Sequence, residues 1–301
     1  MSINSVAIIG LGLLGGSIGL AVRERAPEIA TYGYDTDPHV RETARQRGLT
    51  KHVCDSAEDA VREADLVILC VPVGAMAGAA QALAGSLKRE AIVSDVGSSK
   101  ASVLADLVKA LPDHAIIPAH PVAGTEQSGP EAGFATLFTN RWCILTPPAD
   151  TDEGKVEALN TFWTKLGARI EIMDAEHHDL VLAVTSHIPH LIAFTIVGTA
   201  SDLEEVTRGE VIKYSAGGFR DFTRIAASDP VMWRDVFLNN KTAVLEMLGR
   251  FSEDLTALQR AIRSGDGDTL HELFSRTRTI RRKIIEEGQD DDRPDFGRED
   301  H

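Results

Sequence analysis

The feature that most constrains this chain is a glycine motif, Gly10, Gly12 and Gly15, set between two apolar segments. Residues 6–9 before it are typical of a buried strand, and residues 13–25 after it have the spacing of a helix. In such a turn, small residues let the backbone approach a pyrophosphate at the helix N-terminus, where free N–H groups and the helix dipole favour anions. The motif therefore predicts a dinucleotide site, although the same glycines would also suit a turn that only packs helix on strand.

An acidic residue extends this prediction. Asp35 lies twenty positions after Gly15, at the end of the strand-like run 30–34. A carboxylate there accepts the ribose hydroxyls and repels a 2′-phosphate, so NAD is favoured over NADP. We expect the nearby Arg41 to be a helix-surface charge rather than a phosphate ligand. The predicted cofactor site comprises Gly10, Gly12, Leu13, Leu14, Gly15, Asp35, Val71 and Pro72.

The hydrophobic pattern changes once along the chain. Up to about residue 175 short apolar runs alternate with helical patterns, which indicates an α/β Rossmann domain, a parallel sheet with helices on both faces. We predict its strands at residues 5–9, 30–34, 66–71, 92–96, 116–119, 143–146 and 169–173. After it, long segments at 180–203, 230–262 and 269–287 have helical spacing. The predicted domains are 1–175 (NAD-binding), 176–287 (helical) and 288–301 (a disordered acidic tail).

Charge and cysteine content exclude several classes of protein. The chain has 301 residues and a net charge of −14, a sign that disfavours binding to nucleic acid or anionic lipid. The cysteines at 54, 70 and 143 form no CxxC pair, so neither a disulfide framework nor a thiolate zinc site is indicated. Reduced cysteines and an N-terminus without signal-peptide features predict a cytoplasmic protein. We expect charged residues to interrupt every apolar run before it reaches membrane-spanning length.

Three further segments fall where a doubly wound sheet places its ligands. The segment 95–100, DVGSSK, follows a strand, and Ser98 or Ser99 would by itself be read as the cap of the next helix. His120 follows the apolar run IIPA, and the helical segment SHIPH carries His187 and His190 on one face. A zinc site made of the three histidines is disfavoured, because no HExxH is present and a proline separates the helical pair.

Together these motifs resemble the prephenate/arogenate (cyclohexadienyl) dehydrogenases of tyrosine biosynthesis. The resemblance rests on GLGLLGGS, DVGSSK, HPVAGTEQSG, SHIPH and GGFRDFTRIAASDPVMWRD in that order, and it spans roughly residues 5–285. It implies an NAD-dependent oxidative decarboxylation, in which a hydride leaves C4 of a cyclohexadienol, the ring carboxylate departs as CO₂ and the ring becomes a phenol. It also implies a homodimer formed through the helical domain.

The resemblance assigns a role to each motif. His120 matches the family's proton acceptor, and Ser98, with Ser99 as the alternative, would orient the reacting hydroxyl. Arg224 matches the arginine that holds a substrate carboxylate, while Arg220 is expected to pair with Asp221. The remaining residues assigned to the substrate site are His190 as a contact, His187 as a wall or gate and Glu126 at the entrance.

Several alternatives stay open on the sequence alone. Another NAD-dependent dehydrogenase of a small hydroxy acid is the nearest rival, and a catalytically silent NAD-binding protein is a more distant one. Prephenate and arogenate differ only by a keto or amino group, and the residues do not discriminate between them. We expect Trp233 to be a core residue rather than a wall of the substrate site. Inhibition by tyrosine, if any, would act at the active site.

Overall fold

The structure is a computed structural model, and it describes residues 2–125, 127–202, 210, 213–214 and 217–286. The chain divides into two compact units, residues 1–245 and 246–301. Two predictions fall outside the described residues: the role of Glu126 and the disorder of the acidic tail at 288–301.

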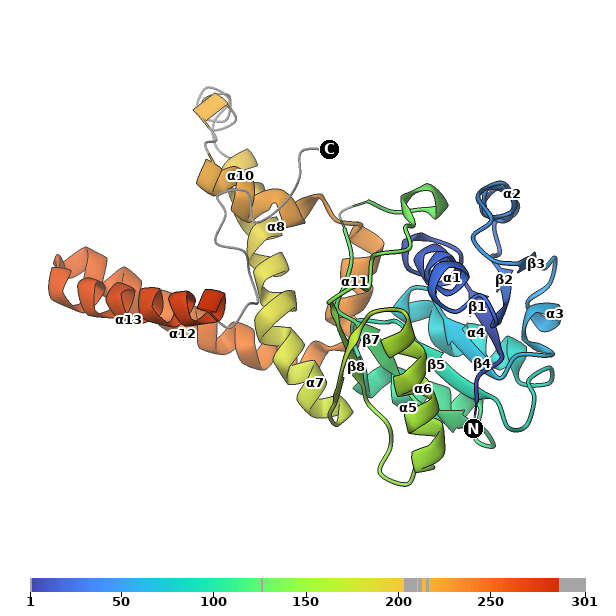
Figure 1. Cartoon of the computed structure of the whole chain (residues 1–301). Coiled ribbons are helices and arrows are strands. Elements are labelled where there is room, and N and C mark those ends of the chain that lie inside the picture. Colours follow the sequence, from blue (N-terminus) through green and yellow to red (C-terminus); the bar gives the residue numbers. More distant parts are fainter. Residues whose placement is uncertain (1, 126, 203–209, 211–212, 215–216, 287–301) are drawn as a thin grey trace. The chain divides into compact units, whose positions relative to one another are not determined.

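The first unit contains a six-stranded parallel sheet, which confirms the predicted doubly wound class. The strand order is β3-β2-β1-β4-β5-β6, so the chain reverses direction across the sheet at the β1/β4 pair (Figure 1). Ligands of such sheets bind beyond the carboxyl ends of the strands at this switch point. The short β3 was not predicted, because two residues carry no recognisable periodicity. The strands are β1 (Ser5–Ile9), β2 (Ala30–Tyr34), β3 (His52–Val53), β4 (Leu66–Leu69), β5 (Ile92–Asp95) and β6 (Ala115–Ile116).

Helices cover both faces of this sheet (Figure 1). Successive residues of a strand point to opposite faces. In β1, accordingly, Val6 and Ile8 belong to one apolar cluster and Ala7 and Ile9 to another. Side chains of α1 and α6 complete the first cluster, and those of α3, α4 and α5 complete the second. These helices are α1 (Leu13–Arg25), α3 (Ala57–Val61), α4 (Met76–Leu83), α5 (Ala101–Ala110) and α6 (Glu153–Lys165), with α2 (Pro38–Arg47) between β2 and β3.

The last two predicted strands do not join the parallel sheet, and the predicted strand 116–119 joins it only through Ile116 of β6, which corrects the expected strand arrangement. A separate sheet consists of β7 (Ala119–Pro121), β8 (Trp142–Leu145) and β9 (Arg169–Ile172), in which β7 and β8 are antiparallel. The predicted strand 116–119 is split at Pro118. Proline has no N–H to donate to a ladder, and its carbonyl accepts instead from the Thr146 N–H at 2.9 Å.

The first unit continues as helices, as the spacing predicts. The apolar segment begins as α7 (Ala175–Leu182), passes through a π-helical turn (Ala183–His187) and continues as α8 (Ile188–Ser201). Pro189 lacks the N–H of an ordinary α-helical bond, and the Ile188 N–H bonds Ala183 O, five residues back. There follow α10 (Gly217–Thr223), a 3₁₀ turn (Arg224–Ala227), α11 (Pro230–Asn239) and α12 (Lys241–Ser264), which runs into the second unit.

The expectation that charged residues interrupt every apolar run is wrong for one segment. Residues 175–201 form one helical stretch that is long and apolar enough to cross a membrane, judged by length and composition alone. Core helices of soluble proteins pass the same test. In this stretch the buried His178, Asp179 and His187 hydrogen-bond to neighbouring elements of the first unit. These three buried polar side chains therefore face the interior of the first unit.

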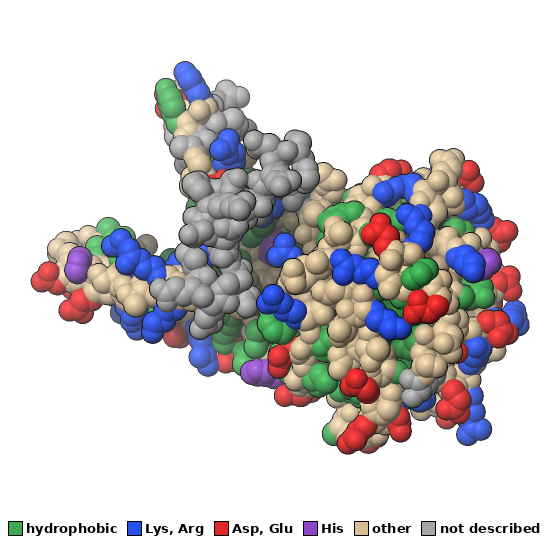
Figure 2. Space-filling view, in the orientation of Figure 1, with side chains coloured by type: hydrophobic (Ala, Val, Ile, Leu, Met, Phe, Trp, Pro, Cys, Tyr) green, Lys and Arg blue, Asp and Glu red, His purple; other side chains and the backbone are tan. Residues whose placement is uncertain are grey.

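The described part of the second unit consists of the end of α12 and of α13 (Gly267–Glu286), joined by a tight turn. Gly265 has φ 71°, a conformation that glycine adopts without a Cβ penalty. Leu255, Ile262, Phe274 and Ile280 of this hairpin are exposed apolar side chains. On the face of the sheet domain drawn in Figure 2, by contrast, acidic and basic side chains are interspersed.

Candidate active site

The glycine motif forms a close turn at the carboxyl edge of β1. Gly10 has φ 99° and donates its N–H to Tyr34 O at 2.8 Å. A Cβ on Gly15 would lie 1.9 Å from Gly10 O, so only glycine fits there. A Cβ on Gly12, in contrast, would meet no atom within 4 Å. Gly12 caps α1 without a side-chain hydrogen bond, and the first-turn N–H groups therefore face an open approach.

Asp35 is fixed beside this turn at the end of β2. Its carboxylate accepts from the Leu11 N–H at 2.9 Å and from the Asp37 N–H at 3.0 Å. Arg41 donates to the carbonyls of Asp35 (2.7 Å) and Thr36 (3.2 Å), so its guanidinium braces the turn. An open helix N-terminus with a carboxylate at the neighbouring strand end fits a dinucleotide without a 2′-phosphate.

Two of the other predicted cofactor residues follow β4, the strand next to β1, and two lie at the start of α1. The Val71 side chain lies 3.3 Å from the position of a Cβ on Gly10, so it packs against the glycine turn. Pro72 precedes a 3₁₀ turn, Val73–Ala75. Leu13 and Leu14 occupy the first turn of α1 and are half-buried. The predicted cofactor residues thus lie at adjacent strand ends.

Neither Ser98 nor Ser99 caps α5, which corrects the local reading of DVGSSK. The cap is Asp179 of α7, whose carboxylate accepts from the Lys100 N–H at 2.7 Å and from the Ala101 N–H at 3.0 Å. Ser99 is buried, whereas Ser98 is half-buried. Neither serine hydroxyl is therefore used as a helix cap, and the side chain of Ser98 is the more accessible of the two.

A buried ion pair lies beneath this turn. The Lys100 ammonium contacts the Asp95 carboxylate and donates to Ala119 O at 2.8 Å. Burial lowers the pKa of Lys100, and the charge of Asp95 opposes that effect. Through these contacts the pair joins the end of β5 to the start of β7, the strand that carries His120.

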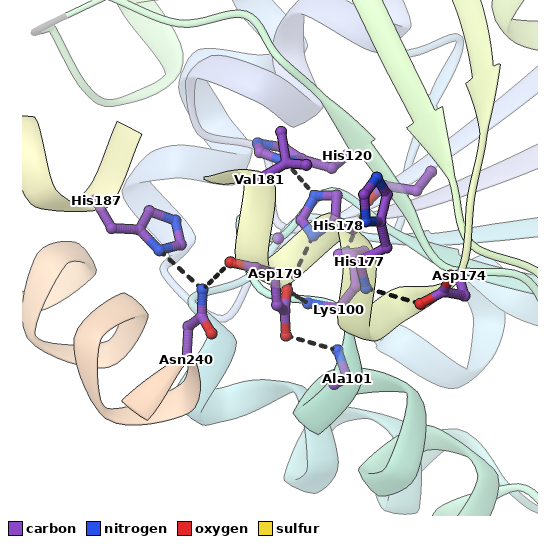
Figure 3. Close-up of polar contacts among 12 residues, drawn as sticks. Lys100, Ala101, His120, Asp174, His177, His178, Asp179, Val181, His187 and Asn240 are labelled. Atoms are coloured by element: carbon purple, nitrogen blue, oxygen red, sulfur yellow. Dashed lines mark hydrogen bonds and ion pairs between the residues drawn. The ribbon is translucent and has the colours of Figure 1, made fainter. Parts of the chain in front are cut away.

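His120 is buried on β7 and is the first of three linked side chains. Its Nδ1 lies 2.8 Å from His178 Nε2, and His178 Nδ1 lies 2.9 Å from Asp179 Oδ1 (Figure 3). The pKa of His120 is lowered well below the ordinary histidine value, first by burial and then by His178, Lys100 and His187. At neutral pH its imidazole is therefore uncharged, the state in which it can accept a proton.

His187 lies on the other side of Asp179 in Figure 3 and is connected to it through Asn240. The Asn240 amide donates to Asp179 O at 2.7 Å and lies 3.1 Å from His187 Nδ1. Burial lowers the pKa of His187 to about 4, partly opposed by Asp179 and by the backbone of Ser98. His187 and Ser98 are thus neighbours.

His190 extends the group toward Arg224. Its Nδ1 lies 2.8 Å from Ser186 O, and its ring stacks on Trp233 of α11. Burial lowers the pKa of His190, and the charge of Arg224 lowers it further. Arg224 begins the 3₁₀ turn that follows α10 and packs against α8. The structure thus groups His190 with Arg224, and His120 with His187.

Sequence reasoning missed several residues of this group. Lys100, His178, Asp179 and Asn240 all form buried hydrogen bonds there. The signal available was adjacent His178 and Asp179 near the start of a long, largely apolar helical stretch, where burial of polar groups requires partners. Within the described ranges, no three His, Cys, Asp or Glu side chains are placed to hold a metal ion.

The fold and the site together define a nicotinamide-dependent dehydrogenase whose sheet domain is followed by a helical domain. The family model "Prephenate dehydrogenase, nucleotide-binding domain" matches residues 18–172, and "Prephenate dehydrogenase, dimerization domain" matches residues 174–276. The chain belongs to the prephenate dehydrogenase family, whose members are NAD-dependent oxidoreductases.

Individual relatives agree with this assignment. A cyclohexadienyl dehydrogenase of Zymomonas mobilis is 48% identical over 276 residues, which are 92% of this chain and 94% of that protein. A prephenate dehydrogenase of Bacillus subtilis is 34% identical, over a match that covers 92% of this chain and 75% of that protein. The crystal structure of an A. aeolicus prephenate dehydrogenase with hydroxyphenyl propionate and NAD⁺ has a TM-score of 0.88 and 35% identity, over 94% of this chain and 99% of that one.

Proposed function

We propose that this protein catalyses the NAD-dependent oxidative decarboxylation of prephenate to 4-hydroxyphenylpyruvate, and of arogenate to tyrosine where it accepts that substrate. The observation that carries the proposal is the buried imidazole of His120, on the strand linked by Lys100 to the carboxyl edge of the dinucleotide sheet. Membership of the family and the 48% identity to a cyclohexadienyl dehydrogenase support it.

The first unit supplies the cofactor site. The first-turn N–H groups of α1 would hold the pyrophosphate at Gly12, and Asp35 would accept hydrogen bonds from the ribose hydroxyls. Val71 and Pro72 line the site beyond β4. When bound, NAD⁺ supplies the hydride acceptor.

His120 handles the proton of the reaction. As the C4–H bond breaks and its electron pair leaves as hydride, His120 accepts the proton of the C4 hydroxyl. The bond between the ring and its carboxylate then breaks, CO₂ departs, and the electrons of that bond aromatise the ring. His120 returns the proton to the phenolic oxygen, so no net proton is consumed. The Ser98 hydroxyl positions the C4 oxygen beside the imidazole.

The helical elements supply the substrate site. Arg224 holds a substrate carboxylate with two parallel N–H donors, and His190 contacts the same end of the substrate. His187, beside Ser98, forms part of the wall of the substrate site. The family motif also assigns Glu126 to the entrance of the substrate site, and this residue lies outside the described residues. These roles follow the family motifs residue by residue.

The family model that matches the helical domain is described as a dimerization domain. We propose a homodimer formed through it, supported by exposed apolar side chains on α8, including Ile196 and Val197. We further propose that the enzyme acts in the cytoplasm without a nucleic-acid or membrane partner, in keeping with its net charge of −14. Light scattering tests the dimer, and a monomeric mass would contradict it.

The experiment that tests the activity offers prephenate and arogenate separately to the purified protein, each with NAD⁺ and with NADP⁺. We expect reduction of NAD⁺ with release of CO₂, and much less reduction of NADP⁺ because of Asp35. The ratio of the two kcat/KM values measures the substrate preference. Small hydroxy acids, tested side by side, represent the nearest rival. Binding of NAD⁺ without turnover of any of them would overturn the proposal.

A further inference from the structure

Asp179, His178 and His120 form one chain of hydrogen bonds that ends at the proposed proton acceptor. Asp179 Oδ1 lies 2.9 Å from His178 Nδ1, and His178 Nε2 lies 2.8 Å from His120 Nδ1 (Figure 3). All three side chains are buried. His178 and Asp179 come from α7, whereas His120 comes from β7. These hydrogen bonds therefore connect the helical part of the first unit to its second sheet.

The acceptor at one end of the chain determines where each proton lies. An ionised carboxylate only accepts hydrogen bonds, so Nδ1 of His178 carries the hydrogen. In a neutral imidazole the other nitrogen then has the lone pair, and burial favours the neutral form of His178 by lowering its pKa. His178 Nε2 is therefore an acceptor, and His120 Nδ1 must donate to it. This leaves the lone pair of His120 on Nε2.

The carboxylate that sets this pattern is itself immobilised. Asp179 accepts from the backbone N–H groups of Lys100 and Ala101 at the start of α5, at 2.7 and 3.0 Å. Its own carbonyl accepts from Asn240 at 2.7 Å. These two backbone donors at the N-terminus of α5 fix the position of the carboxylate and use it as a hydrogen-bond acceptor. Asp179 thus caps α5 with both carboxylate oxygens and anchors the hydrogen-bonded histidines with one of them, Oδ1.

We propose that His178 and Asp179 are positioning residues that hold His120 in its Nδ1–H tautomer, so that Nε2 is the atom that accepts the substrate proton. This inference rests on the proposed function for its chemical meaning. When His120 gains a proton on Nε2, its Nδ1–H continues to donate to His178, and the Asp179 carboxylate lies behind that bond. Neither His178 nor Asp179 gains or loses a proton in the step.

The first test replaces His178 and compares kinetics. His178→Leu removes the acceptor for His120 Nδ1–H, and we expect kcat to fall by roughly 10²-fold, the low end of a general-base contribution. KM for NAD⁺ should stay within about twofold, because the cofactor site is untouched. In His178→Gln the carboxamide oxygen can still accept, so part of the loss should be restored. The matched control is His177→Gln, an exposed neighbour on the same helix, which should behave as wild type.

The second test needs no substrate and no turnover. Nitrogen-15 NMR of histidine-labelled protein distinguishes a protonated from an unprotonated ring nitrogen, and His120→Asn assigns the signal. We expect Nδ1 of His120 to carry the proton in the wild type and the Nε2–H form to appear in His178→Leu. An Nε2–H tautomer in the wild type would overturn the proposal, as would a folded His178→Leu variant with unchanged kcat. If the wild type turned over neither substrate, the activity proposal would fail while the tautomer result still decided this one.

Discussion

The imidazole of His190 lies nearly parallel to the indole of Trp233, with ring centroids 3.7 Å apart and 24° between the planes. Trp233 is buried, as expected of a core residue, and one face of its ring is covered by His190, a side chain of the proposed substrate site. The Ser186 carbonyl holds His190 Nδ1 from its own helix. One tryptophan therefore both fills the core and orients a proposed substrate contact.

Replacing this ring should affect substrate binding more than turnover. We expect Trp233→Leu to raise KM for prephenate several-fold, because an aromatic pair contributes about 0.5–1.5 kcal/mol. KM for NAD⁺ should not change. Trp233→Phe keeps a ring against His190 and should lie near wild type in steady-state kinetics. The control Trp163→Phe alters a buried aromatic of the sheet domain and should leave KM for prephenate unchanged. Equal KM values in the Leu and Phe variants would contradict a role for the stack.

Two glycines of one motif should respond differently to alanine. Gly12→Ala places its Cβ in open space, so we expect normal thermal unfolding but weaker binding of NAD⁺, because the methyl group occupies the approach to the helix N-terminus. Gly15→Ala puts a Cβ 1.9 Å from Gly10 O and should lower the unfolding temperature. Calorimetry measures both quantities. Unchanged NAD⁺ affinity in Gly12→Ala would argue that the turn serves packing alone.

Replacing the proposed base and replacing the proposed anion-binding residue should change different kinetic parameters. His120→Asn should lower kcat by about 10²–10⁴-fold and leave NAD⁺ binding nearly intact, because only the proton acceptor is lost. Arg224→Ala should chiefly raise KM, by roughly 10- to 100-fold, the cost of one charge-assisted hydrogen-bonded pair. Steady-state kinetics and NAD⁺ titration check both. Equal loss of cofactor binding in His120→Asn would contradict its assignment.

Buried neutral histidines predict a loss of stability in mild acid. Burial lowers the pKa values of His120, His178 and His187, the last to about 4. In the unfolded chain these side chains take up protons near pH 6.5, so between that pH and the lower folded values the unfolded state binds more protons. The free energy of unfolding should therefore fall as pH drops through this window.

Urea unfolding near neutral pH and at about pH 5 measures the effect. Each unit of pKa difference is equivalent to roughly 1.4 kcal/mol, so a loss of a few kcal/mol is expected. His187→Asn should show a shallower dependence, because one of the groups that titrate on unfolding is absent. A free energy of unfolding that is constant across this range would show that the buried histidines are not neutral in the folded protein.

Several features could be predicted from the sequence because each depends on a few neighbouring residues. Gly10 needs a positive φ that glycine readily adopts, and Gly15 needs the absence of a side chain; both appear directly as a motif. Asp35 is predictable because its distance from the motif equals one helix and one strand. The alternation of strands and helices, and the change to continuous helix after β9, likewise follow from local periodicity.

The rest was decided by contacts between residues far apart in the chain. Asp179 caps a helix that begins 78 positions before it, and His178 meets His120 across 58 positions. A local pattern assigns a cap to the nearest serine, because it contains no information about which distant carboxylate arrives there. The split of the strands at Pro118 into two sheets has the same origin. The sequence by itself determined the dinucleotide turn and the candidate chemical groups, whereas packing of α7 against α5 and β7 decided which groups share hydrogen bonds and hence how the proposed base is oriented.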